Sequence, residues 1–141
     1  MTSSGGGAIG GPALKVGIDL VLVAAVEDSL RIHAERYLRR VYTSRELCDC
    51  VTSSGAPDAR RLAARFAAKE ATLKLLRDGD QAVPWREIGV RSDRYGRPSV
   101  ELAGSAAALA RRRGIDSIEV SLTHEGPFAA AVVIASVPEA P

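Results

Sequence analysis

The chain has 141 residues, a hydrophobic fraction of 46% and a formal net charge of +2. This length fits one domain, and the apolar content is enough for a core, which excludes disorder as the default state. The near-neutral charge, without any nucleic-acid-reading motif, argues against nucleic acid as a partner. The apolar runs IDLVLVAAV and AAAVVIA are too short to cross a bilayer, so we expect no membrane span.

The N-terminal residues 1–13 are rich in Gly and Ser and predict a flexible tail ahead of a single domain over 14–138. They lack the charged and apolar regions of a secretory signal. Cys48 and Cys50 lie one residue apart, where a disulfide would be strained and a zinc site would need further ligands. We therefore interpret them as free thiols of a cytoplasmic protein.

The first half of the chain predicts one strand followed by helices. Residues 14–23 are apolar and β-branched and predict the strand, and apolar residues at spacings of three and four predict a helix over 27–41. A capping box, Thr43-Ser-Arg-Glu46, begins a short helix. After a loop over 52–57, Asp58 can cap a long helix that runs to about Leu76.

The second half predicts mainly strands. A hairpin is expected from two strands joined by the turn Asp93-Arg-Tyr-Gly96, and a helix ends at Gly114. The expected elements are strands over 87–91, 99–102, 117–123 and 128–137 and a helix over 105–113. This order predicts an α+β domain in which a mostly antiparallel sheet packs against the long helix. The last strand is almost uncharged on both faces, which predicts that the protein is not a monomer.

The long helix contains the sequence RFAAKEATLK from Arg65 to Lys74 and is apolar nearly all round. Glu70 falls on the shoulder of its apolar stripe, where a carboxylate is costly unless it is paired or binds a metal. Two interpretations stay open: an ion pair of Glu70 with Lys74, four residues on, or a metal ligand. The chain has three lysines against sixteen arginines, and Lys69 and Lys74 are two of them. This usage favours a site that needs a compact ammonium group or a titratable amine.

Two further polar residues interrupt or end apolar strands. Asp19 lies within Val16-Gly-Ile-Asp-Leu-Val21 and either faces solvent or presents a carboxylate to a metal. His124 closes a strand and is either a turn residue or a contact to a phosphate or metal. Together with Glu70 and Lys74 they make two carboxylates and two nitrogen bases, a set that suits Mg²⁺ beside a pyrophosphate.

Three pieces of the chain resemble the holo-acyl-carrier-protein synthases, the small 4′-phosphopantetheinyl transferases. The pieces are GIDLV from Gly17 to Val21, RFAAKEATLK from Arg65 to Lys74, and SLTH from Ser121 to His124 followed by the apolar AAAVV. The resemblance implies an enzyme that moves the phosphopantetheine arm of coenzyme A onto a serine of an acyl carrier protein and releases 3′,5′-ADP. It also implies a homotrimer with active sites between subunits.

By the same resemblance, Asp19 and Glu70 look like ligands of Mg²⁺, and Lys74 and His124 like phosphate contacts, so that these four form the catalytic set. Arg65 and Lys69 look like further contacts to coenzyme A. Metal and cations would neutralise charge on the pyrophosphate as its bond breaks. Whether Glu70, Lys74 or a water molecule takes the serine proton stays open.

The chain departs from the family pattern in two places. A single glycine, Gly79, stands where a G-x-G turn is usual, and Ala25 stands where an arginine is used in carrier docking. We then expect the carrier protein to dock on other arginines, in the helix that follows the first strand, because acyl carrier proteins are acidic. The alternative is that these arginines form an ordinary solvated helix face. These arginines are Arg31, Arg36, Arg39 and Arg40. The departures point to a specialised enzyme for a polyketide or other secondary-metabolite carrier, and a fatty-acid carrier is the other expected substrate. A catalytically inactive trimeric binding module of the same fold is the alternative function.

Overall fold

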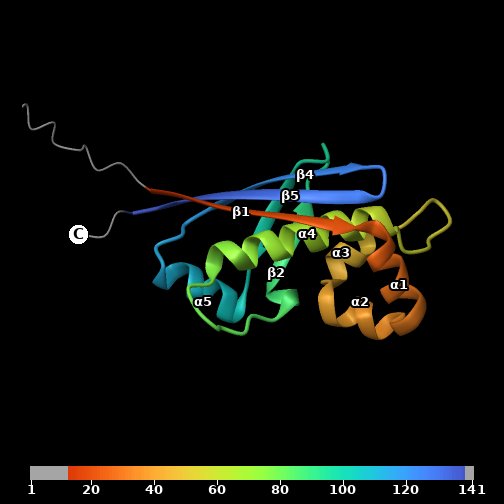
Figure 1. Ribbon diagram of the computed structural model, residues 1–141, viewed down its shortest axis with the longest axis horizontal. Coiled ribbons are helices and arrows are strands. Elements are labelled where there is room, and N and C mark those ends of the chain that lie inside the picture. The colour runs from red at the N-terminus through yellow and green to blue at the C-terminus, as the bar shows by residue number, and fades with distance from the viewer. Residues whose placement is uncertain (1–12, 139–141) are drawn as a thin grey trace, which may run out of the picture.

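The computed structural model describes residues 13–138. Its larger sheet has the order β1-β5-β4, and both pairs of neighbours are antiparallel (Figure 1). The strands are β1 (Ala13–Leu22), β4 (Ile118–Glu125) and β5 (Phe128–Val137). The predicted α+β class and the antiparallel pairing are confirmed.

The predicted hairpin also forms, but as a separate two-stranded sheet. Its strands are β2 (Ile88–Ser92) and β3 (Pro98–Leu102), and a short 3₁₀ helix, η1 (Trp85–Glu87), precedes it. The turn depends on Asp93, whose carboxylate accepts hydrogen bonds from the backbone N–H groups of Tyr95 and Arg97. A single continuous sheet is therefore not the outcome, because β3 pairs with β2 and not with β4.

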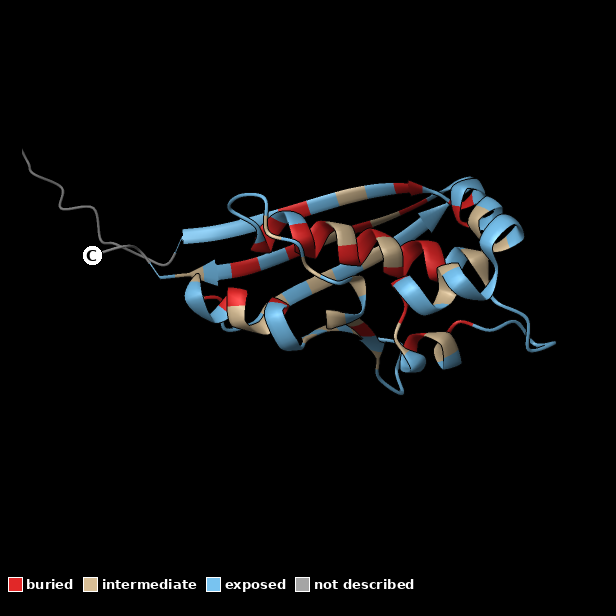
Figure 2. Cartoon of the chain, turned by 90° about the horizontal axis from the view of Figure 1, so that it is seen from below, coloured by how far each residue is buried: buried red, intermediate tan, exposed pale blue. Residues whose placement is uncertain are grey.

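The long helix α4 (Ala59–Leu76) is the centre of the molecule. Asp58 caps it as predicted, since its carboxylate accepts from the backbone N–H groups of Arg60 and Arg61. Figure 2 shows α4 red along most of its length, because the large sheet covers one side and the hairpin and the small helices cover the other. Small alanine side chains on both sides allow this close double packing. The helix α5 (Gly104–Arg112) packs beyond the C-terminal part of α4.

The single helix predicted over 27–41 is wrong in its start and its continuity. Helix α1 spans Val23–His33 and α2 spans Glu35–Val41, with Ala34 between them at a φ of 43°. The helix begins early because the Val23 backbone N–H donates to Pro127 O in the β4–β5 turn, at 2.9 Å. A positive φ is outside the helical region, so Ala34 interrupts the ladder and redirects the chain. The next helix, α3 (Ser44–Asp49), begins at the predicted capping box of Thr43 and Glu46.

Glycine at position 17 allows β1 to lie directly against α4. A Cβ atom built there would stand 2.1 Å from the carbonyl oxygen of Ala71 and 3.0 Å from a methyl group of Val133. Any larger residue would force the strand away from the helix. This contact brings the neighbouring Asp19 within reach of the side chains on α4.

The face of the large sheet that points away from α4 is apolar and open. Alternate residues of β1 lie on it, with exposed fractions from 50% to 72%: Leu14, Val16, Ile18, Leu20 and Leu22. They stand opposite Val132 and Ile134 of β5, among others, which extends the apolar surface over both strands. Exposed side chains of this kind, gathered on one face, are typical of an interface.

Of the predicted N-terminal tail, residues 1–12 lie outside the described residues, and Ala13 already belongs to β1. No helix among residues 13–138 is both long and apolar enough to cross a membrane. Both cysteines are free, as predicted, and burial raises the pKa of the Cys50 thiol to about 12, so that it is no nucleophile.

Candidate active site

Three of the predicted site residues meet where β1 crosses α4. Lys74 Nζ donates to the carboxylate of Asp19 and to the backbone oxygen of Ile18, each at 3.0 Å. Asp19 lies in the middle of its strand with its side chain 17% exposed, and it faces the helix. Glu70, half-buried, stands one helical turn before Lys74 on α4. We call Asp19, Glu70 and Lys74 the carboxylate half.

Of the two interpretations of Glu70, the ion pair with Lys74 does not form, because Lys74 pairs with Asp19. Burial raises the pKa of Glu70, and the nearby Asp19 charge raises it further, whereas Lys74 opposes the shift. The two carboxylates repel each other at an edge that faces solvent, and a divalent cation bound between them would remove this repulsion. Asp19 and Glu70 would supply two carboxylate ligands. This number fits Mg²⁺, which keeps waters and phosphate oxygens as its other ligands.

Lys69 occupies a different environment from Lys74. Its side chain is completely buried, and its ammonium group donates to Glu46 Oε1 at 2.7 Å, Ile88 O at 2.6 Å and Trp85 O at 3.2 Å. An ammonium group has three N–H donors, so this set satisfies it fully. Burial lowers the pKa of Lys69, and the Glu46 carboxylate counteracts this shift. The compact lysine ammonium fits where a guanidinium would not, which explains the use of lysine here.

The structure therefore corrects the expectation that Lys69 contacts coenzyme A. A completely buried ammonium group with all its donors used has no surface for a ligand. Its partner Glu46 also accepts from the backbone N–H groups of Thr43 and Val90. The pair thus joins α3, β2 and α4, and holds the helix that carries Glu70 and Lys74. The capping box was visible in the sequence, but this second role of Glu46 depends on contacts with distant residues.

We expect Lys69→Met to lower the free energy of unfolding by about 3–5 kcal/mol, because it leaves the Glu46 carboxylate buried without its cation. Chemical denaturation measures this. The matched control is Lys15→Met, at an exposed lysine of β1, which should change the free energy by less than about 0.5 kcal/mol. Equal effects of the two substitutions would show that the buried pair has no special role in stability.

The remaining predicted residues lie in a pocket of about 280 Å³ between α4, β3 and β4. Arg65 is 6% exposed, and its Nη2 donates to Ser92 Oγ at 3.1 Å, whereas its buried Nε has no hydrogen-bond partner among the described residues. His124, on β4, and Arg61 also line this space, which we call the basic pocket. Arg61 and Ser92 were not predicted. Arg61 could have been, since it precedes Arg65 by four residues and so lies on the same helix face.

The basic pocket and the carboxylate half lie on opposite sides of α4. At about 100° per residue, Arg65 and Lys74 point about 180° apart on the helix. On the sheet, Asp19 belongs to β1 and His124 to β4, with β5 between them, which separates their strands by about 10 Å. One chain therefore brings together Asp19, Glu70 and Lys74 but does not bring His124 or Arg65 to them.

The arginines expected to dock a carrier protein form an exposed group on α1 and α2. Arg31 pairs with Asp28 and Arg39 pairs with Glu35, and both pairs are largely exposed. Arg36 and Arg40 line a pocket with Tyr37 and the exposed His33. This surface begins directly after β1, the strand that carries Asp19.

The sequence is similar to known 4′-phosphopantetheinyl transferases over nearly the whole chain. The family model of the 4′-phosphopantetheinyl transferase superfamily matches residues 15–133. The chain is 40% identical to the holo-acyl-carrier-protein synthase of Halothermothrix orenii over 84% of this chain and 94% of that protein. It is 42% identical to that of Paramagnetospirillum magneticum, over 84% and 92% respectively.

Solved structures show the same fold. The synthase of Helicobacter pylori in complex with coenzyme A superposes with a TM-score of 0.73 at 26% identity, covering 86% of this chain and 99% of that one. The synthase of Mycobacterium tuberculosis gives 0.66 at 39% identity, covering 88% and 97%. On these matches in sequence and fold, the chain belongs to the 4′-phosphopantetheinyl transferase superfamily.

Proposed function

We propose that this protein is a holo-acyl-carrier-protein synthase, which transfers 4′-phosphopantetheine from coenzyme A to a serine hydroxyl of an apo acyl carrier protein. The observation that carries the proposal is the meeting of Asp19, Glu70 and Lys74 at one edge of α4, in a chain of this superfamily. The serine oxygen forms a bond to the phosphorus that bears the pantetheine arm. The bond from that phosphorus to the bridging oxygen breaks, and 3′,5′-ADP leaves.

Asp19 and Glu70 would hold Mg²⁺, and the ion would supply positive charge to the phosphate oxygens when bound. Lys74 donates two of its hydrogen bonds to Asp19 and Ile18 and keeps a third N–H for a phosphate oxygen. The serine proton has three candidate acceptors, which are Glu70, Lys74 and a water molecule.

The basic pocket would bind the phosphates and nucleotide of coenzyme A. Arg65 is held in place by its hydrogen bond to Ser92, and its side chain lines the pocket. Arg61 and His124 add further nitrogen groups on the same pocket. Guanidinium groups are well suited to phosphates because their donors are arranged in a planar fork.

We further propose that a complete site forms only between two copies of the chain, in a homotrimer. The carboxylate half and the basic pocket of one chain face away from each other across α4, so a bound pyrophosphate must meet the carboxylate half of a neighbour. The open apolar face of β1 and β5 gives the neighbour a surface to pack against. The number three comes from the family resemblance.

Incubation with coenzyme A, Mg²⁺ and a panel of apo carrier proteins tests the function. A mass gain of one phosphopantetheine group on a carrier is the expected result, and the panel of fatty-acid and polyketide carriers identifies the preferred one. Binding of coenzyme A without transfer to any carrier would favour the inactive binding module instead. The simultaneous presence of Asp19, Glu70, Lys74 and His124 argues against that alternative.

Reversal of charge at Arg31 and Arg39, to Glu, tests the carrier surface. We expect the KM for the carrier to rise by about tenfold or more and the KM for coenzyme A to stay within about twofold, because acidic carriers are attracted to this surface. The effect should shrink as salt is added, since exposed charges are screened over about 8 Å at physiological ionic strength. Steady-state kinetics measure both constants; if they rise together, these arginines belong to the fold or to the nucleotide site.

A further inference from the structure

The end of α4 that carries Lys74 closes without a glycine cap. The last four carbonyl groups of a helix have no partner within the helix itself. The Arg77 backbone N–H donates to Leu73 O at 3.0 Å, and the chain then leaves α4 in an extended conformation, with Arg77 at φ −81° and ψ 138°, instead of a left-handed cap. Leu75 and Leu76 are buried, so their carbonyl groups need donors from elsewhere in the chain.

Arg113 supplies these donors from the end of α5. Its Nη1 donates to Leu75 O and to Leu76 O, each at 2.8 Å. This nitrogen bears two N–H groups, so the two carbonyl groups use both of them. The guanidinium charge also lies at the negative end of the helix dipole of α4. The side chain of one residue thus holds the last turn of α4 in its helical form.

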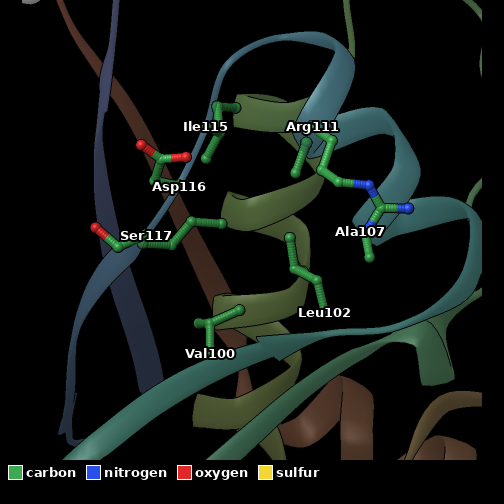
Figure 3. A pocket seen from close by; sticks show the side chains of 9 residues that line it. Val100, Leu102, Ala107, Arg111, Ile115, Asp116 and Ser117 are labelled. Carbon is green, nitrogen blue, oxygen red and sulfur yellow. The ribbon is translucent and has the colours of Figure 1, made fainter.

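The backbone at the end of α5 fixes the position of Arg113. The N–H groups of Gly114 and Ile115 donate back to carbonyl groups of α5 at 3.0 Å and 2.9 Å, which is the Schellman pattern. Gly114 has a φ of 72°, the left-handed conformation that this pattern requires. Figure 3 shows Ile115 beside the ribbon of α4, and Ile115 belongs to one core cluster with Leu75 and Leu76. Arg113 is therefore held both by its backbone and by its guanidinium group.

Lys74 depends on the turn that Arg113 holds. It lies directly before Leu75, and its ammonium group reaches across to β1, where it donates to Asp19 and to Ile18 O at 3.0 Å each. Helix ends fray when their terminal carbonyl groups have no partner. Building on the proposed function, we propose that Arg113 is a positioning residue for the transfer reaction, which keeps Lys74 beside Asp19 by closing the end of α4.

Transfer kinetics of Arg113→Met in the full chain test this role, because methionine keeps an apolar stem and removes the donors. We expect kcat per folded molecule to fall by about tenfold or more, since small misplacements of a positioned group carry losses of this size. Arg113→Lys keeps a charged nitrogen with N–H donors on a shorter stem, so it should lose less. It also replaces the methionine variant should the latter fail to fold. Backbone amides of residues 73–77 should exchange faster in heavy water in Arg113→Met, which reports the opened turn without any activity measurement.

Thr43→Ala is the matched control for the loss of a helix cap. It removes the cap of α3 and leaves the end of α4 intact, so its kcat per folded molecule should stay within about twofold of the wild-type value. A double-mutant cycle with Lys74→Ala separates positioning from general stability. If Arg113 acts through Lys74, Arg113→Met should lower kcat by less than about twofold in the Lys74→Ala background.

Wild-type kcat in a folded Arg113→Met variant, or a loss that multiplies with that of Lys74→Ala, overturns the positioning role. Unchanged amide exchange at the end of α4 overturns it as well, whether or not transfer is detected. Failure of the wild type to transfer to any carrier protein instead overturns the proposed function, and the positioning role with it.

Discussion

Asp19→Ala and Glu70→Ala are each expected to reduce transfer to the carrier protein by about 10²–10³-fold or more, the usual cost of removing a group that stabilises charge in the transition state. Each substitution removes half of the only carboxylate pair that faces Lys74 in the described residues. The rate is measured at saturating coenzyme A and carrier, over a range of Mg²⁺ concentrations. The isosteric Asp19→Asn and Glu70→Gln should behave similarly, because they keep the shape and remove the charge.

Neither substitution should unfold the protein. Glu70 is half-buried, and burial disfavours its ionised form, so the native state does not depend on its charge. Asp80→Ala, at an exposed carboxylate outside the site, is the control for a general effect of charge. Near wild-type turnover of either variant at high Mg²⁺ would remove Asp19 and Glu70 from the assigned metal site.

Local signals in the sequence predicted most of the fold. The Asp58 cap, the Thr43–Glu46 capping box and the strand expected over 117–123 each depend on residues within a few positions of one another, and each was confirmed. The start of α1 was missed because its first residues continue the apolar run of β1, and the anchoring bond to Pro127 comes from the far end of the chain. The break at Ala34 was missed because alanine carries no signal for a positive φ.

The composition of the site could be predicted, but its arrangement could not. The scarcity of lysine drew attention to Lys69 and Lys74, yet only the fold separates a buried structural ammonium from an exposed one. In the same way, the sequence grouped His124 with Asp19 and Glu70, whereas the strand order β1-β5-β4 places them apart in one chain. A pattern of residue types does not state which chain completes a site.

Co-expression of Glu70→Ala chains with His124→Ala chains should restore activity that neither variant has alone. Glu70 belongs to the carboxylate half and His124 to the basic pocket, which lie on opposite sides of α4. If neighbouring copies complete each site, random mixing in equal amounts gives about one site in four both intact residues. We therefore expect up to about a quarter of the wild-type rate, measured as carrier modified per site.

The matched control is co-expression of Asp19→Ala with Glu70→Ala. Both substitutions then lie in the carboxylate half, so the carboxylate half of every chain in the mixture is defective. No activity should therefore return. Rescue in the first mixture and not in the second distinguishes a shared site from a simple stabilising effect of mixing. An active monomer in sedimentation would contradict the shared site outright. An oligomer without rescue would mean that Glu70 and His124 of each site belong to one chain. That outcome would require α4 to lie differently from its position between β1 and β4 here.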